Sequence, residues 1–239
     1  MKHLKSLLIA AAGLVTIAAP ALAADMRMPV KAPAPVATPV ATWTGLYLGI
    51  NGGGAWGTTR HTDSTTGLTT NNYSQSGGLI GGTYGANWQT GMFVLGFEGD
   101  FDWANINGNF TNAGLCGVNN GNTCFTKLQD FGTDRIRVGV DVSGWLLYGT
   151  GGVAYGEVNA GQTPCGGVFV GGCGQKWRSG WVAGGGVEKM FAPHWSAKLE
   201  YLHFDFGNDV QYRPVVNVNV LERGDIVRGG INYLFNPFP

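Results

Sequence analysis

Residues 93–103 read FVLGFEGDFDW. Apolar side chains and one glycine occupy the odd positions, and three of the positions between them are acidic: Glu98, Asp100 and Asp102. Because successive side chains of a strand point to opposite faces, this alternation predicts a β-strand with one oily and one acidic face.

The segment DRIRVGV, residues 134–140, gives the acidic face a partner. Arg135 and Arg137 share one face, while Ile136, Val138 and Val140 share the other. If the two segments are neighbouring strands, opposite charges meet across the ladder. Later segments add four more charged residues to the same predicted polar side: Glu188, Lys198, Glu200 and Arg228.

The rest of the chain contains further segments of period-two pattern, separated alternately by long and short connections. The connections near Gly91, Gly144 and Pro193 are short, whereas the others are long and rich in Gly, Asn and Thr. An even number of strands with all short turns at one end predicts an all-β, eight-stranded antiparallel up-and-down transmembrane β-barrel. The expected strands are residues 43–56, 77–89, 92–103, 129–141, 145–156, 176–190, 195–206 and 223–235.

Large side chains at the strand ends favour a membrane barrel over a soluble one. Phe93 and Trp103, like Trp145 and Tyr155, are ten residues apart. Ten tilted steps rise about 25 Å, the height of a lipid-facing band. The predicted interface aromatics are Trp56, Trp88, Phe93, Trp103, Trp145, Tyr155, Trp177 and Trp195.

Some positions stay open at this point. Phe131 is expected with the aromatics at the long-loop end, and Trp43 near the short turns, although its parity is wrong unless a bulge intervenes. The stretch WLLYGTGGVAYG from Trp145 is too apolar on both sides to assign faces. A soluble β-sandwich, with the aromatics capping its core, would also show alternation.

The first 42 residues are expected to precede the barrel. Lys2 and Lys5 come before an apolar run that ends in the small-x-small site Ala21-Leu22-Ala23, so residues 1–23 are predicted to be a signal peptide. A retained membrane anchor is disfavoured because the run is shorter than the roughly 18 residues that span a bilayer. Four prolines predict that residues 24–42 form an extended periplasmic tether before a barrel domain of residues 43–239.

Composition and motifs exclude several kinds of protein. Basic and acidic side chains both number 15 and no basic stripe is present, which argues against nucleic acid as a partner. No pattern of a nucleophile elbow, zinc protease or phosphate loop occurs, so no catalytic residue, cofactor or metal is expected. The runs of glycine do not open a helix, and strand packing explains them better than dinucleotide binding.

The four cysteines fall into two predicted loops, in pairs eight residues apart. In an exported protein this spacing favours disulfides within each loop, Cys116 with Cys124 and Cys165 with Cys173. A four-cysteine metal site would need the two loops to converge and lacks CxxC spacing.

Several segments together resemble the outer-membrane surface-antigen barrels of alphaproteobacteria, of the porin-family or outer membrane immunogenic protein type. They cover nearly the whole chain after residue 42. The segments are WTGLYLGINGGGAWG from Trp43, GFEGDFDW from Gly96, DRIRVGV from Asp134, WLLYGTGGVAYG from Trp145, WVAGGGVEKM from Trp181, WSAKLEYLHFDFG from Trp195 and VRGGINYLF from Val227.

The resemblance implies a barrel similar to the membrane domain of outer membrane protein A, set in outer-membrane lipid. It also implies insertion by the barrel-assembly machinery through a C-terminal aromatic strand. The sequence departs from the family there, because four residues, 236–239, follow Phe235. The Ala24-Asp25 start of the mature chain is similar to N-termini that attach covalently to peptidoglycan, which makes Ala24 a candidate attachment site.

The expected function is a structural, surface-exposed barrel that contributes to envelope integrity and presents its long loops to the environment or a host. Nine charged side chains would fill the narrow interior of eight strands. A small-solute diffusion channel is the alternative. A secreted barrel with an apolar ligand and an outer-membrane lipid hydrolase or acyltransferase are less favoured, and the oligomeric state stays open.

Overall fold

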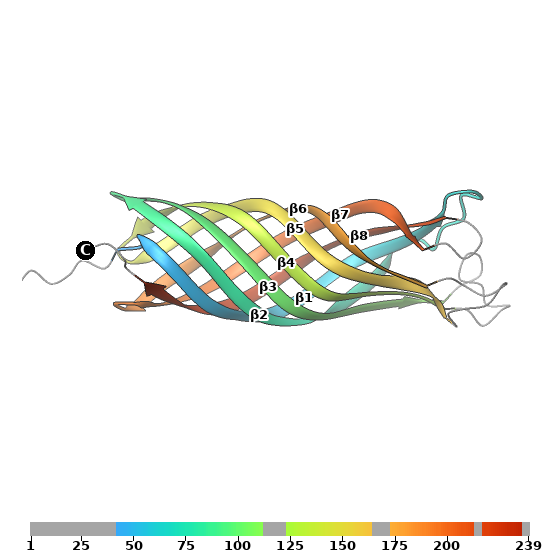
Figure 1. Cartoon of the computed structure of the whole chain (residues 1–239), viewed down its shortest axis with the longest axis horizontal. Coiled ribbons are helices and arrows are strands. Elements are labelled where there is room, and N and C mark those ends of the chain that lie inside the picture. The colour runs from blue at the N-terminus through green and yellow to red at the C-terminus, as the bar shows by residue number, and fades with distance from the viewer. Residues whose placement is uncertain (1–41, 112–122, 164–172, 213–216, 236–239) are drawn as a thin grey trace, which may run out of the picture. The chain divides into compact units, whose positions relative to one another are not determined.

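The computed structural model describes residues 42–111, 123–163, 173–212 and 217–235. Eight antiparallel strands form a closed barrel in which each strand pairs with its neighbours in sequence and β1 pairs with β8 (Figure 1). The strands are β1 (Gly45–Asp63), β2 (Tyr73–Thr90), β3 (Phe93–Phe110), β4 (Thr123–Val142), β5 (Trp145–Thr163), β6 (Cys173–Ala192), β7 (Trp195–Tyr212) and β8 (Val218–Phe235). The predicted fold class is confirmed.

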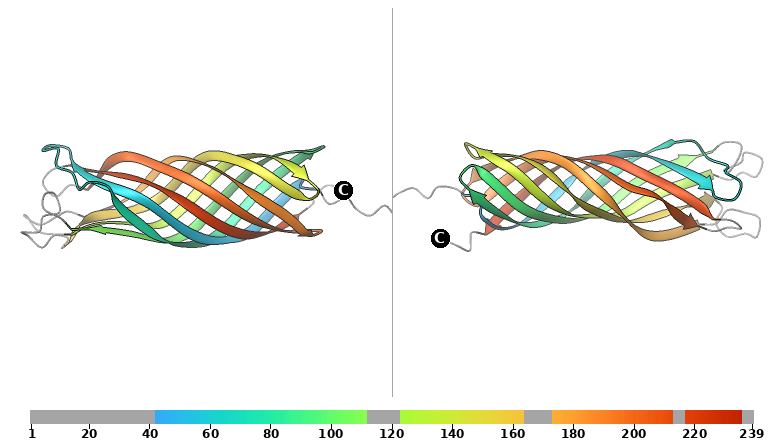
Figure 2. Two further views of the ribbon diagram at one scale, coloured as in Figure 1. Left: turned by 180° about the vertical axis from the view of Figure 1, so that it is seen from behind. Right: turned by 90° about the horizontal axis from the view of Figure 1, so that it is seen from above.

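Short turns join β2 to β3, β4 to β5 and β6 to β7 at one end of the barrel (Figure 2). Ser143 and Gly144 both have positive φ, 55° and 76°, as the twist-matched hairpin turn requires. Gly91 also has a positive φ, 60°, in the β2–β3 turn. The sequence therefore located these three turns correctly: Gly91 and Gly144 permit a backbone that other residues avoid, and Pro193 marks the β6–β7 turn.

The strands are longer than expected at the other end. They contain 18 to 20 residues, which corresponds to about 45 Å along the barrel axis against a lipid band of about 25 Å. Residues placed in loops, such as His61, Tyr73 and Cys124, lie in strands. The pattern was misjudged there because the strands leave the membrane, so the outward positions become polar and the contrast between faces fades.

Side-chain direction matches the alternation in β3. Phe93, Leu95 and Trp103 are exposed on the outside, and Glu98, Asp100 and Asp102 are buried inside. In the unassigned fifth strand, Leu146 and Tyr148 point inward and Trp145 points outward.

Two further aromatics point inward. Trp43 lies near the short turns, as expected, and its parity was the correct guide to its direction: it precedes β1, is 1% exposed, and donates its backbone N–H to Gln89 Oε1. Phe131 is 0% exposed and lies inside the barrel, on the same odd-numbered face of β4 as the inward Arg135 and Arg137, so the alternation itself places it there. The irregularity between Leu128 and Asp130 reverses the alternation on its other side, so the even-numbered Leu128 also points inward.

No helix within the described ranges, with their gaps at 112–122, 164–172 and 213–216, is long and apolar enough to cross a membrane.

Candidate functional site

The lumen contains a charged layer built from the nine residues that the sequence predicts for it. Each of the nine residues is at most 4% exposed. They come from β3, β4, β6, β7 and β8 and comprise Glu98, Asp100, Asp102, Arg135, Arg137, Glu188, Lys198, Glu200 and Arg228.

Arg135 joins β3 to β7 across the lumen. Its Nη2 lies 2.6 Å from Glu98 Oε1 and 3.0 Å from Asp100 Oδ2, and its Nη1 lies 2.8 Å from Glu200 Oε1. Its Nε donates to Thr133 Oγ1 at 2.8 Å. The guanidinium therefore has partners in several directions, which offsets part of the cost of removing it from water.

Arg228 holds the layer together on the β8 side. Its Nη1 lies 2.8 Å from Asp102 Oδ2, its Nη2 lies 2.6 Å from Asp100 Oδ2, and its Nε donates to Glu200 Oε2 at 3.0 Å. Asp100 and Glu200 are shared with Arg135, so the two arginines belong to one network.

Arg137 extends this network toward the short-turn end. It contacts Glu188 Oε2 at 2.6 Å and Glu98 Oε2 at 3.1 Å, and its Cζ lies 4.0 Å from the centre of the Tyr148 ring. Lys198 Nζ lies 2.8 Å from the other oxygen of Glu98, Oε1.

Sequence reasoning missed the neutral members of the layer. Tyr47 donates its hydroxyl to Glu98 Oε2 at 2.7 Å, Tyr148 donates to Glu200 Oε1 at 3.0 Å, and Asn232 donates to Glu188 Oε1 at 2.7 Å. Tyr47 lies between the outward Leu46 and Leu48, so its parity was the signal that could have placed it inside.

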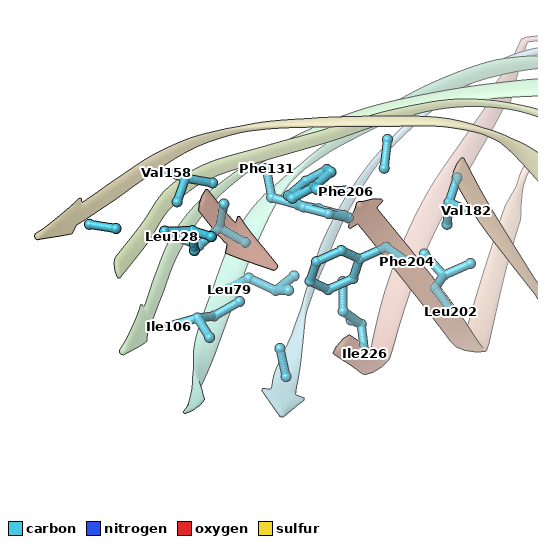
Figure 3. Close-up of a cluster of buried hydrophobic side chains, with 14 of the residues drawn as sticks. Leu79, Ile106, Leu128, Phe131, Val158, Val182, Leu202, Phe204, Phe206 and Ile226 are labelled. Atoms are coloured by element: carbon cyan, nitrogen blue, oxygen red, sulfur yellow. The ribbon is translucent and has the colours of Figure 1, made fainter. Parts of the chain in front are cut away.

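An apolar layer fills the lumen on the loop side of the charges (Figure 3). Phe131, Phe204 and Phe206 pack against one another, with ring centres 5.1 to 6.3 Å apart. The other large side chains of the cluster that are labelled in the figure are Leu79, Ile106, Leu128, Val158, Val182, Leu202 and Ile226. The predicted interior was polar throughout, so this layer was not foreseen.

A second polar layer lies beyond the aromatic rings. His61 Nε2 and the hydroxyls of Tyr73 and Thr126 are mutually 2.9 Å apart, and His61 is fully buried. Arg178 donates to backbone carbonyl oxygens of Val220 and Phe206 at 2.8 and 3.0 Å. The sequence placed these residues in loops or gave them no particular role. They come together only because the strands are longer than the sequence predicts.

The predicted interface aromatics point out of the barrel. Seven are between 44% and 68% exposed, and Tyr155 is partly covered where its ring lies over Gly132. The seven are Trp56, Trp88, Phe93, Trp103, Trp145, Trp177 and Trp195.

Two of the predicted disulfide partners, Cys116 and Cys165, lie outside the described residues, as does Ala24. Cys124 belongs to β4 and Cys173 to β6, with β5 between them. Two strand spacings are about 9.6 Å, beyond the reach of a disulfide, so these two do not pair with each other. Pairing within each loop stays a prediction. Among the described residues no cysteine is free, and no group of three or more His, Cys, Asp or Glu could hold a metal ion.

The comparisons with known proteins agree with this barrel architecture. A family model described as outer membrane protein beta-barrel domain covers residues 9–221. The chain belongs to this family of outer-membrane barrels.

Curated relatives agree with the family. The chain is 36% identical over 172 residues to the 31 kDa outer-membrane immunogenic protein of Brucella melitensis, covering 67% of this chain and 68% of the relative. It is 31% identical over 242 residues to the 25 kDa outer-membrane immunogenic protein of Brucella abortus, covering 98% and 100%. Among solved structures it is similar to OprG of Pseudomonas aeruginosa, with 12% identity, a TM-score of 0.41, and coverage of 82% of this chain and 99% of that one. The expected outer-membrane location, in membrane lipid, is confirmed.

Proposed function

We propose that this protein is a structural, surface-exposed barrel that contributes to the integrity of the envelope and does not form an open channel. The observation that supports this proposal most directly is that side chains fill the lumen. Residues that water barely reaches come from opposite sides of the barrel in both the charged and the apolar layer. Asp100 in the charged layer and Leu128, Leu202 and Ile226 in the apolar layer, for example, are 0% exposed.

The ion pairs support a structural role more directly than a transport role. A solute path through the charged layer would have to separate arginines from carboxylates 2.6 to 3.1 Å away and then displace the phenylalanine rings beyond them. Each such separation leaves buried charge unpaired, which is costly. The Brucella relatives are outer-membrane immunogenic proteins, which fits strand ends and loops that face the outside.

Planar-bilayer conductance tests this proposal against the alternative of a small-solute channel. The refolded protein should give no steady conductance above the background of the lipid. A variant with Phe131→Ala, Phe204→Ala and Phe206→Ala should conduct more than the wild type, because it hollows the apolar layer. Steady conductance of the wild type that the three alanines do not change would favour the channel.

Four features of the proposal rest on sequence and resemblance: cleavage after Ala23, insertion by the barrel-assembly machinery, the two loop disulfides, and wall attachment through Ala24. The proposal that the protein has no enzymatic activity rests on the same two sources. Mass spectrometry of purified sacculi tests the attachment, since a peptide that begins at Ala24 should remain linked to the wall after digestion. Sacculi without that peptide would exclude it.

A further inference from the structure

The outer wall of the barrel has a groove in the face formed by β8, β1 and β2. It has a volume of about 870 Å³. Its floor is glycine, including Gly52, Gly82 and Gly229, and Trp103 lies at its side. Apolar side chains, Ile50, Ile80 and Ile231, stand around this floor and are 45% to 68% exposed.

Steric exclusion of a larger side chain does not explain the glycines of this floor. A Cβ built on Gly52, Gly82 or Gly229 would meet its nearest atom at 3.4 to 3.8 Å, which is ordinary contact. Larger residues would therefore fit, and they would fill the groove. The opening faces the hydrocarbon band below Trp56 and Trp103, so its natural occupant is an acyl chain.

A second pocket of about 270 Å³ lies higher on the same face. It is lined by Trp56, Thr58, Ser74, His203 and Arg223, among others. Thr58 is six residues above Gly52 on β1, which puts the pocket about 15 Å above the glycine floor. Thr58 is two residues beyond Trp56, so the pocket lies at the level of the lipid headgroups of the outer leaflet.

Two arginines bring positive charge to this level. Arg223 is opposite Thr58, and Arg60 is two residues further along β1 on the same outward face. Such diagonal neighbours have Cα atoms about 7–8 Å apart. Among the described residues neither guanidinium forms an ion pair, and Arg223 makes only a 3.4 Å contact from Nε to Thr58 Oγ1.

Two carboxylates lie near Arg223: Asp225, which lines the same pocket, and Asp205, and each accepts hydrogen bonds from groups other than Arg223. Asp225 accepts hydrogen bonds from the Tyr201 hydroxyl at 2.6 Å and from His203 Nδ1 at 2.8 Å. Asp205, opposite Arg223 on β7, accepts the Gly207 N–H at 2.6 Å. Arg60 and Arg223 therefore bring two positive charges to the same part of the outer face with no ion-pair partner among the described residues, and a phosphate between them would accept charge-assisted hydrogen bonds from both.

We infer that the β8–β1–β2 face binds a phosphorylated lipid of the outer leaflet, with a phosphate at Arg60 and Arg223 and an acyl chain along the glycine groove. The two pockets are on one strip of the barrel wall, in the vertical order that such a lipid requires. The binding site is on the outside, so it is independent of whether the lumen conducts.

Native mass spectrometry of the full-length, refolded protein in detergent tests this inference. The probes are bisphosphorylated lipid A and the same lipid after enzymatic removal of its phosphates. The wild type should retain the phosphorylated form at least about tenfold more tightly, as expected for charge-assisted hydrogen bonds. Equal retention of the two forms would overturn the inference without any variant.

Two matched pairs of variants locate the site. Arg223→Gln, alone and with Arg60→Gln, should weaken binding of phosphorylated lipid A about tenfold, whereas Lys127→Gln should not. Lys127 is an outward lysine near the loop end of β4. Gly52→Leu with Gly229→Leu should weaken binding of both lipid forms, whereas Gly149→Leu with Gly151→Leu should not. The second pair is on β5, and a Cβ at these positions would likewise be in ordinary contact with its nearest atom, at 4.0 and 3.7 Å.

Each variant is first shown to be folded by its resistance to unfolding in SDS without boiling. If the arginine and lysine variants bind alike, no phosphate site exists at Arg60 and Arg223. If the leucines on β1 and β8 abolish a dimer of this chain and leave lipid binding intact, the groove is a protein interface and the inference is wrong.

Discussion

At the scale of single residues, the barrel depends on pairing in its charged layer. Glu98 accepts contacts from Arg135, Arg137 and Lys198. Asp100 and Glu200 are each shared by Arg135 and Arg228. A buried ion pair is weak evidence for stability as such, but removing one partner leaves charge that neither water nor lipid can solvate.

Arg135→Ala should therefore lower the free energy of unfolding by about 3–5 kcal/mol, because Glu98, Asp100 and Glu200 each lose a partner. Urea titration of the protein in phospholipid vesicles measures the change. The control is Lys176→Ala, which breaks an exposed ion pair with Asp209 and should cost at most about 1 kcal/mol. Equal losses in the two variants would mean that the network contributes no more than a surface pair.

At the scale of the strands, the sequence predicts their number and order well and their ends poorly. The alternation in residues 93–103 is strong because one face meets lipid and the other meets arginine. Beyond the membrane both faces become polar or mixed, as at Asn105 and Asn107, and period two no longer indicates burial. The register shift in β4 has no pattern of its own in the sequence, so the inward position of Leu128 could not be predicted. Phe131 shares the odd parity of Arg135 and Arg137, so its inward position could have been.

The β4–β5 hairpin gives a test at this scale. Ser143 holds a φ of 55°, which asparagine adopts more readily than serine. Ser143→Asn should raise the free energy of unfolding by about 0.5 kcal/mol, and Gly144→Val should lower it by at least about 1 kcal/mol. Unfolding in urea measures both. A stabilising Gly144→Val would contradict the positive φ of 76° at that position.

At the scale of the whole molecule, closure is the decisive property. The pairing of β1 with β8, from Leu46 with Phe235 to Asp63 with Val218, leaves no strand edge open to lipid. Closure satisfies the backbone hydrogen bonds of every strand, which a membrane demands.

Such a barrel should resist SDS until it is heated. Outer-membrane fractions run without boiling should show a band of altered mobility that boiling converts to the position expected for the unfolded chain. Arg135→Ala removes buried ion pairs from the charged layer, so it should lower the temperature at which the folded band converts to the unfolded one. A wild-type protein whose mobility is independent of boiling would contradict a closed, resistant barrel.

The strands continue for roughly 20 Å beyond the lipid band, if about 45 Å of strand is compared with about 25 Å of membrane. This projecting part is a rigid pedestal, because inter-strand hydrogen bonds join its strands and the packed rings of Phe131, Phe204 and Phe206 fill the lumen at its base. The pedestal does not depend on the identity of the residues at its tip. The sequence at the tip can therefore change while the height above the membrane at which it is held stays the same.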